Sequence, residues 1–214
     1  EFLIVILNES QTSQAAPFGE FGGTKPNALF RSLNAIDKKL FFKVPDAFEI
    51  LNLQPLLAEI VLLKTIPIPA NHDEIFDDAV IKTIKALNLD ILIKFGFGNL
   101  SGEVLRASKY GIWSYFFGDG RVAIKDPPAY WEVVENRLET KSGLVRSTYT
   151  QPVAEILYSS SFQTFPFSFY RNRNLVCWGS APFLFRQIKF LHHSGEKVFF
   201  TNIKKFGQMD KTKA

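Results

Sequence analysis

A single cysteine and the absence of any long apolar run restrict what this 214-residue chain can be. Cys177 has no second cysteine to pair with, so an intrachain disulfide framework and a zinc site built from cysteines are excluded. The longest apolar run, Phe2 to Leu7, is too short for a membrane span or a signal peptide. We therefore expect a cytoplasmic protein that has no membrane span and no metal site.

The chain also lacks the short motifs of several large enzyme classes. No Gly-Lys-Ser/Thr follows the glycine turn Gly96-Phe97-Gly98, which excludes a phosphate-binding P-loop there. The same turn lacks the third glycine of the dinucleotide-binding fingerprint, and no Gly-x-Ser-x-Gly nucleophile elbow occurs. The residues alone therefore show no obvious catalytic set.

The charge of the chain is weakly basic and spread out. The formal net charge is +4, and lysine and arginine are scattered until the last third of the chain. Proteins that bind nucleic acids usually gather such charge in a stripe, so we expect a small-molecule substrate and no nucleic acid. The alternative is nucleic-acid binding through the basic residues Arg171, Arg173, Arg186 and Lys189. That alternative predicts a steep loss of affinity as the salt concentration rises.

The stretch around the glycine turn carries the fold prediction. Apolar residues predict a buried strand at Ile91 to Phe95, a short helix at Gly102 to Ser108 and a second strand at Gly111 to Tyr115. Strand, glycine turn, helix and strand form the βαβ unit of a parallel sheet. Ligands bind at the carboxyl ends of such strands, so we expect residues 96–99 and 116–121 to line one crevice.

Two further apolar runs, Phe2 to Leu7 and Glu59 to Lys64, predict central strands of the same sheet, because such runs are covered on both faces. The clearest helix spans Asn71 to Leu87, where apolar residues recur every three or four positions and acidic residues precede basic ones. The predicted fold is α/β, with a three-layer, mainly parallel twisted sheet and helices on both faces. We expect one domain over residues 1–190 and a C-terminal extension or tail over 191–214.

Local patterns predict the remaining elements. Helices are expected at Pro26 to Asp37, at Ala129 to Glu135, and at Ser168 to His193 with a stop at Gly195. Runs rich in β-branched and aromatic residues predict strands at Leu144 to Tyr149, Ile156 to Phe162 and Val198 to Thr201. The first two of these are expected to be separate strands or a hairpin pair, and Lys38 to Val44 is expected to be a linker or an edge strand. The 22 phenylalanines indicate an aromatic-filled interior or an aromatic-lined groove.

Histidine and cysteine are too isolated to predict a reactive centre. His72 has no second metal ligand nearby in the sequence and is interpreted as a surface or capping residue. His192 and His193 have no carboxylate at metal-binding spacing, so we interpret them as a basic helix end. Cys177, beside Trp178 in an apolar setting, is interpreted as a packed thiol rather than a nucleophile.

Three longer motifs carry a family resemblance. Trp113 to Arg121 contains Trp-Ser-aromatic followed by Gly-Asp-x-Arg, and Pro127 to Val133 reads Pro-Pro-x-x-Trp-Glu-Val. Arg171 to Phe183 contains Arg-Asn-Arg-Asn followed by Trp-x-Ser-Ala-Pro-Phe. With these motifs, about residues 89 to 190 resemble bacterial formyltransferase-like proteins. Those proteins are related to the formyltransferase-like part of plant glucosamine inositolphosphorylceramide transferases.

The resemblance implies a formyltransferase fold, which is related to the Rossmann fold, and 10-formyltetrahydrofolate as the cofactor. Enzymes of that family use an Asn, a His and an Asp, and this chain departs from all three. Ser114 stands at the Asn position, Phe116 at the His position, and Pro152 or Ala154 at the Asp position. A phenyl ring cannot donate to a developing oxyanion or move a proton. We therefore expect no formyl transfer by the usual Asn-His-Asp route.

The resemblance and the crevice together suggest roles for individual residues. The predicted catalytic residues are Ser114 and Asp119. The predicted cofactor-binding residues are Phe95, Gly96, Phe97, Gly98 and Asn99, and the predicted substrate-binding residues are Phe116, Arg121, Trp131, Arg171 and Arg173. The arginines could hold a phosphate or carboxylate through two hydrogen bonds. The alternatives are that Asp119-Gly120 is a turn signal and that Arg171 to Asn174 is a solvated helix start or a structural salt-bridge block.

Two functions follow from these residues. The first is a transferase that moves a one-carbon or sugar unit to a polar, amino-sugar-like acceptor through an altered set of residues. The second is a catalytically inactive binding protein of the same fold, in which Phe116 and Phe117 form a stacking floor.

Overall fold

The structure is a computed structural model of the chain. It describes residues 4–8, 28–41, 45–47, 49, 52, 55, 61–70, 73–95, 97–118, 129–201 and 203–205. The chain divides into two compact units. The first unit combines Glu1–Ala15, Ile50–Ser114 and Arg146–Ala154, and the second unit combines Ala16–Glu49, Tyr115–Val145 and Glu155–Ala214.

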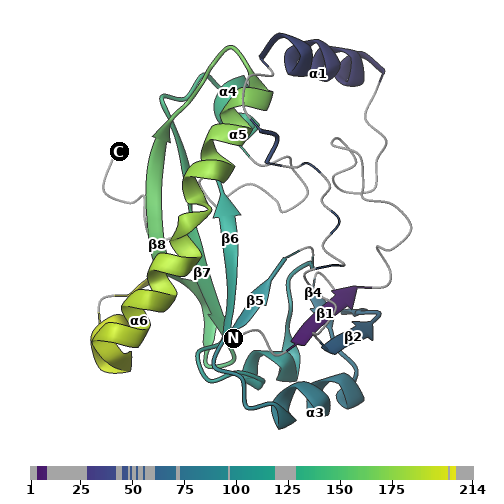
Figure 1. The fold of residues 1–214 in the computed structure, drawn as a ribbon, viewed down its shortest axis with the longest axis vertical. Coiled ribbons are helices and arrows are strands. Elements are labelled where there is room, and N and C mark those ends of the chain that lie inside the picture. The colour runs from purple at the N-terminus through teal and green to yellow at the C-terminus, as the bar shows by residue number, and fades with distance from the viewer. Residues whose placement is uncertain are drawn as a thin grey trace. The chain divides into compact units, whose positions relative to one another are not determined.

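Two pairs of parallel strands occur in the first unit (Figure 1). Strand β1 (Ile4–Asn8) pairs in parallel with β2 (Val61–Thr65), and β5 (Leu92–Lys94) pairs in parallel with the first residues of β6 (Ile112–Phe117). The 3-10 helix η3 (Gly102–Arg106) connects β5 to β6 along the chain. The predicted strand, turn, helix and strand are therefore present, although the helix is a short 3-10 helix, which is wound more tightly than an α-helix.

The strands form mixed rather than mainly parallel sheets. β5 and β6 belong to a five-stranded sheet of order β5-β6-β7-β8-β9, whereas β1 and β2 form a separate two-stranded sheet among the described residues. The prediction that one mainly parallel sheet contains all four segments is therefore wrong. What the structure supports is an α/β fold with mixed strand pairing.

Short connections explain the antiparallel part of the five-stranded sheet. Strands β7 (Glu139–Thr148) and β8 (Gln151–Gln163) are separated by Tyr149 and Thr150 alone, and a parallel pair needs a crossover of about a dozen residues or more. β6 also runs against β7, because the Gly118 amide donates to the Lys141 carbonyl while Gly111 lies against the backbone of Ser147. The last strand, β9 (Lys204–Lys205), pairs antiparallel with β8.

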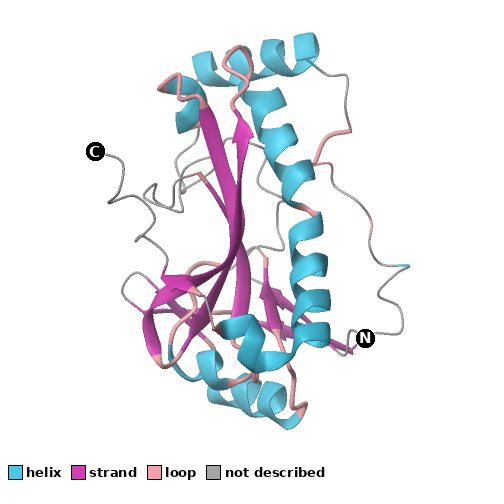
Figure 2. Cartoon of the chain, turned by 90° about the vertical axis from the view of Figure 1, so that its left-hand side faces the viewer, coloured by secondary structure: helices cyan, strands magenta, loops and turns pink. Residues whose placement is uncertain are grey.

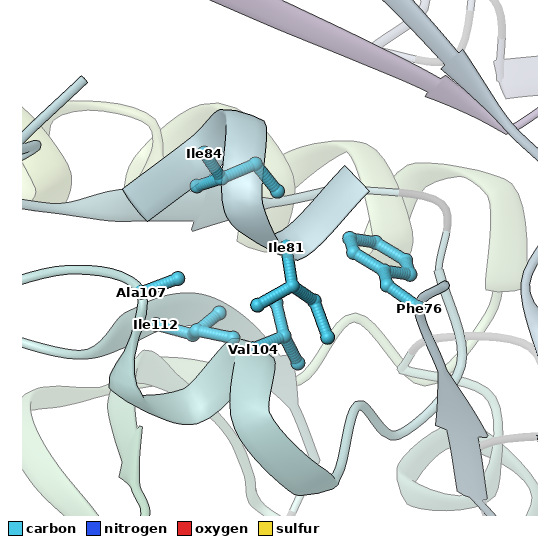
Figure 3. Close-up of a cluster of buried hydrophobic side chains, with 6 residues drawn as sticks. All are labelled: Phe76, Ile81, Ile84, Val104, Ala107 and Ile112. Carbon is cyan, nitrogen blue, oxygen red and sulfur yellow. The ribbon is translucent and has the colours of Figure 1, made fainter. Parts of the chain in front are cut away.

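The core of the first unit gathers apolar side chains from a helix, the 3-10 helix and β6 (Figure 3). Helix α3 (Asp78–Ala86) contributes Ile81 and Ile84, η3 contributes Val104, and β6 contributes Ile112. Leu92 of β5 packs against this cluster from its edge. The apolar face predicted for this helix is therefore the face that is buried in the core, as expected for an amphipathic helix.

The helix predicted over Asn71 to Leu87 is confirmed over Asp78–Ala86, and its first part is wrong. Strand β4 (Asp73–Ile75) occupies that part and pairs antiparallel with β3 (Ile68–Ala70), which contains Pro69. Glu74 also forms a parallel bridge with Leu100. Backbone pairing on both sides of β4 outweighs the local charge pattern, because intrinsic helix preferences amount to less than about 1 kcal/mol per residue.

Replacing Asp77 by alanine is expected to lower the free energy of unfolding by about 1 kcal/mol. The Asp77 side chain caps α3 by accepting a hydrogen bond from the Ala79 amide at 2.7 Å, and alanine leaves that amide without the cap. Urea denaturation would measure the change. Lys82→Ala, at an exposed position of the same helix, is the control and should change the free energy by less than about 0.5 kcal/mol. Equal effects of the two variants would contradict the capping role.

The second unit contains helices and most of a long β-hairpin (Figures 1 and 2). The predicted hairpin is confirmed with longer strands, β7 and β8. The helices are α1 (Ala28–Phe41), α4 (Trp131–Val134), α5 (Phe169–Ser180) and α6 (Pro182–Phe200). Helix α6 runs along the hairpin, where the Phe183 ring lies 4.6 Å from the Tyr158 ring and 6.3 Å from the Phe162 ring, centroid to centroid.

Three predictions for the second unit need correction. Helix α1 continues to Phe41, so much of the segment expected as a linker or edge strand is helical. The single helix expected after Ser168 is divided into α5 and α6 at Ala181. Gly195, at φ 75° and ψ 163°, interrupts α6 as predicted, but a second helical stretch follows it to Phe200, so the strand expected at Val198 to Thr201 is wrong. The buried Phe199 explains the continuation, because its ring packs on Phe190 of the preceding turns at 5.6 Å.

Within the described part of the chain, no helix has the length and apolar character needed to cross a membrane. Helix α6 continues across residue 190, where the C-terminal extension was expected to begin. The boundary between a 1–190 domain and a 191–214 tail stays a prediction.

Candidate active site

Two polar side chains lie on one face of the first unit where the parallel register of β5 and β6 ends, at the last residue of β5 and the third residue of β6. Lys94 is the last residue of β5, and its partner in the parallel register is Ser114. Leu92 and Ile112 pair two residues earlier and face the apolar core. Side chains alternate along a strand, so Lys94 and Ser114 lie on that same face, one step beyond the core. This edge is where parallel strands place their ligands.

The turn that follows β5 is held by Glu74 of β4. The Gly98 amide donates to a carboxylate oxygen of Glu74 at 3.0 Å, and the Glu74 amide donates to the Asn99 carbonyl at 2.6 Å. The Ser101 amide in turn donates to the Glu74 carbonyl at 3.0 Å. A Cβ atom at Gly98 would lie 3.0 Å from the Glu74 carboxylate, so glycine allows this close approach. One residue therefore fixes the turn with its backbone and with its side chain.

The Lys94 side chain binds the same turn through the Gly98 carbonyl. Its ammonium donates to the Gly98 carbonyl at 2.9 Å, and the side chain is half-buried. Burial lowers the pKa of Lys94, and the negative charges of Glu74 and Asp73 offset part of that effect. We call Lys94, Ser114, Glu74 and Gly98 the β5–β6 edge site. The sequence signal for Lys94 is a lysine at the end of an apolar strand, two residues before a glycine turn.

The residues expected to bind a cofactor in this turn have different environments. Phe95, the residue after Lys94 in the chain, is 65% exposed, so most of its side chain is open to solvent. Phe97 instead packs against the core and meets the Phe76 ring edge to face at 5.4 Å. Asn99 is exposed, and Gly96 lies outside the described residues. Of the two phenylalanines, Phe95 has the geometry for stacking on a ligand.

Phe116, at the position of the family histidine, takes part in packing in the second unit. A Cβ atom at Gly143 would lie 2.6 Å from the Phe116 ring and would also collide with the Tyr158 carbonyl oxygen. The Ser142 hydroxyl donates to the Phe116 carbonyl at 3.0 Å. The pairing of Ser142-Gly143 with Phe116 therefore depends on close contact between a ring and a glycine backbone.

Two predicted site residues, Asp119 and Arg121, follow β6 along the chain and lie outside the described residues. Trp131 begins α4 and packs its ring edge to face on Tyr130 at 5.4 Å. Sequence reasoning missed its neighbour Glu132, which is 3% exposed and whose carboxylate lies 3.0 Å from a Cβ atom placed on Gly118. Because the predicted crevice combines residues of both units, it stays a prediction.

Arg173 is an internal cation of the second unit. Its side chain is 2% exposed and forms an ion pair with Asp46 at 3.5 Å. Burial lowers the pKa of Arg173 to about 10, against the opposing effect of Asp46. Arg171, by contrast, is exposed, and its guanidinium lies 4.3 Å from the centre of the Phe165 ring. The geometry favours the salt-bridge alternative for Arg173 and leaves Arg171 accessible to a ligand.

Asn172 and Asn174 complete the Arg-Asn-Arg-Asn block as buried hydrogen-bonding side chains. Asn172 accepts from the Phe165 amide at 2.9 Å and donates to the Ala129 carbonyl and the Thr140 hydroxyl, both at 3.1 Å. Asn174 accepts from the Ala47 amide at 2.6 Å. The block therefore ties together segments that are far apart in the sequence.

Cys177 is less acidic than a free thiol. Burial raises its pKa to about 12, so the sulfur is protonated at neutral pH. This supports the interpretation as a packed thiol, because the thiolate is the nucleophilic form. The His193 ring nitrogen Nδ1 is within 2.7 Å of the Lys189 carbonyl one turn back, as expected for a histidine near a helix end.

Among the described residues, histidine, cysteine, aspartate and glutamate nowhere gather in a group of three that could hold a metal ion. The expectation that the protein uses no metal stays a prediction. Comparison with known proteins adds no family: none of the protein-family models matches the chain, and neither does any curated protein.

Proposed function

We propose that this chain is a formyltransferase-like transferase that moves a one-carbon or sugar unit to a polar, amino-sugar-like acceptor. The observation that carries the proposal is the β5–β6 edge site, where Lys94 at the carboxyl end of β5 and Ser114 within β6 are register partners in a parallel pair. This is the position at which α/β folds of the Rossmann-related kind bind their ligands. The proposal includes their three-layer arrangement.

The residues of the edge site suit 10-formyltetrahydrofolate. The Ser114 hydroxyl and the Lys94 ammonium are hydrogen-bond donors for a formyl oxygen, and the exposed ring of Phe95 can stack on an aromatic pterin. When bound, the cofactor would supply the formyl group. The roles expected from the sequence for Asp119, as an orienting or acid-base group, and for Arg171, as a ligand of a phosphate or carboxylate, stay predictions.

The contacts of Phe116 favour the second candidate function, a binding protein without turnover. Its ring is packed against Gly143, and no proton can pass through it. Replacing Phe116 by histidine should not create the usual reaction, because the family aspartate position is Pro152 or Ala154. The two functions share a ligand and differ in whether the ligand reacts.

Release of tetrahydrofolate from 10-formyltetrahydrofolate, measured with a panel of amino sugars, would test the proposal. Transfer should occur, and Ser114→Ala should slow it by about 10-fold through the loss of one neutral hydrogen bond of about 1.5 kcal/mol. Ser161→Ala, at an exposed position of β8, is the matched control and should have no effect. Nucleotide sugars would be assayed in parallel as donors.

Thermal denaturation with folates and nucleotide sugars separates the remaining outcomes. A ligand present at a hundred times its dissociation constant stabilises the native state by about 2.7 kcal/mol. Stabilisation without turnover would select the binding protein. Neither stabilisation nor turnover would reject the formyltransferase-like function altogether.

A further inference from the structure

We infer that Lys94 is a catalytic residue that stabilises the negative charge developing on the oxygen of the transferred carbonyl group. This inference rests on the proposed function. The family histidine is replaced by Phe116 in this chain, and Lys94 stabilises the oxyanion in its place. Ser114 is the second donor to the same oxygen.

The position of Lys94 is the first argument. It shares one face of the β5–β6 pair with Ser114, because the two residues are partners in a parallel register. Neighbouring strands lie about 4.8 Å apart, so donors from the two side chains can converge on a single oxygen atom. Phe95, the next residue, exposes its ring at the same strand end.

The orientation of Lys94 is the second argument. An ammonium group has three N–H donors, and one of them is used on the Gly98 carbonyl at 2.9 Å. The Gly98 amide in turn donates to the Glu74 carboxylate at 3.0 Å. The ammonium is thus fixed before any ligand arrives and retains donors for one. A donor held in place in this way needs no reorganisation when charge develops.

The surrounding charges are the third argument. The carboxylates of Glu74 and Asp73, both on β4, act on Lys94 and favour its charged form, whereas burial opposes it. A half-buried cation interacts with a developing oxyanion more strongly than a solvated one, because the local dielectric constant is lower. Lys94 therefore combines positive charge, partial burial and fixed direction.

The reaction needs no further reactant. The acceptor amine nitrogen forms a bond to the formyl carbon, and the bond between that carbon and N10 of the folate breaks. The proton lost by the acceptor nitrogen ends on N10, and nothing is oxidised or reduced. Lys94 stays protonated throughout and donates a hydrogen bond to the carbonyl oxygen while that oxygen bears negative charge.

Lys94→Met tests the inference against a purely structural role in closing the turn. The methionine variant should lose about 10²–10³-fold in kcat, which is the usual effect of removing one oxyanion donor, with KM changed by less than about threefold. Lys94→Arg keeps a charged donor and should retain activity within about 10-fold of the unmodified protein. Lys82→Met, at an exposed position of α3, is the matched control and should be fully active.

The pH dependence of kcat gives a readout that a structural role would not move. The inferred role needs the charged form, which is lost as pH rises through the pKa of Lys94. Since that pKa is lowered, kcat of the unmodified protein should fall at a pH below about 10.4, the value of a free lysine. In the Lys94→Arg variant this fall in kcat should begin at a higher pH, because the guanidinium stays charged.

The outcomes separate this inference from the proposed function. Turnover by the unmodified protein together with an active Lys94→Met variant would overturn the inference and leave the function intact. Loss of activity in both the arginine and the methionine variants, with a lower melting temperature in each, would also overturn it in favour of the structural role. Absence of turnover in the unmodified protein would reject the function and the inference together.

Discussion

Replacing Asn172 by leucine is expected to lower the free energy of unfolding by about 4 kcal/mol, because three groups lose a buried partner at about 1–3 kcal/mol each. Asn172 is 0% exposed. The groups are the Phe165 amide, the Ala129 carbonyl and the Thr140 hydroxyl. Thr140 retains its bond to the Thr164 hydroxyl at 2.9 Å, which keeps the total below three full penalties.

Urea denaturation of the Asn172→Leu variant would measure this loss. Asn99→Leu is the matched control, since Asn99 is exposed and the same substitution there should change the free energy of unfolding by less than about 0.5 kcal/mol. A loss below about 1 kcal/mol at Asn172 would mean that the three groups find other partners. The network would then have no central role in the second unit.

Gly143→Ala is expected to destabilise the protein by about 3 kcal/mol or more, at the upper end of what overpacking of a core costs. The added methyl group would meet the Phe116 ring at 2.6 Å and the backbone oxygen of Tyr158 on the neighbouring strand. A ring can turn aside, but a backbone carbonyl moves only if β8 shifts relative to β7. The loss of stability therefore arises mainly from disturbing the pairing of β7 with β8.

Gly98→Ala provides the comparison for Gly143→Ala. Its added methyl group would meet the end of the Glu74 side chain at 3.0 Å, which can move by a few tenths of an ångström. The loss of conformational freedom in the unfolded chain also favours alanine by about 0.4–1 kcal/mol. We expect a net change within about 1 kcal/mol by thermal or urea denaturation. Similar losses at Gly98 and Gly143 would show that backbone contact is not the deciding factor.

Local sequence patterns predicted the elements whose own residues supply the reason for their structure. The apolar run before the glycine turn is β5, the aromatic run after it is β6, and the two pair in parallel. The β-branched and aromatic segments on either side of Tyr149 and Thr150 form the hairpin. Hydrophobic periodicity and turn-forming residues act over a few positions, so these elements can be predicted without knowing which distant segments pack on them.

Patterns failed where pairing with a distant segment decided the structure. Asp73–Ile75 has the acidic composition of a helix start, yet it forms β4 because β3 lies alongside it. The family resemblance suggested Ser114 as a site residue but gave no indication of Lys94, whose importance depends on its register with β6 and on the turn that Glu74 holds.

The sequence by itself determined the α/β character, the β5–η3–β6 segment and the choice of Ser114 as a site residue. Only the tertiary structure decided the strand pairing of the sheets, the burial of Arg173 beside Asp46, the register of Lys94 with Ser114, and the contacts of Lys94 and Glu74 with Gly98. The physical reason is that apolar spacing reports which face of an element is buried, and it carries no information about which other element covers that face. Polar side chains acquire their charge state and direction from that covering element.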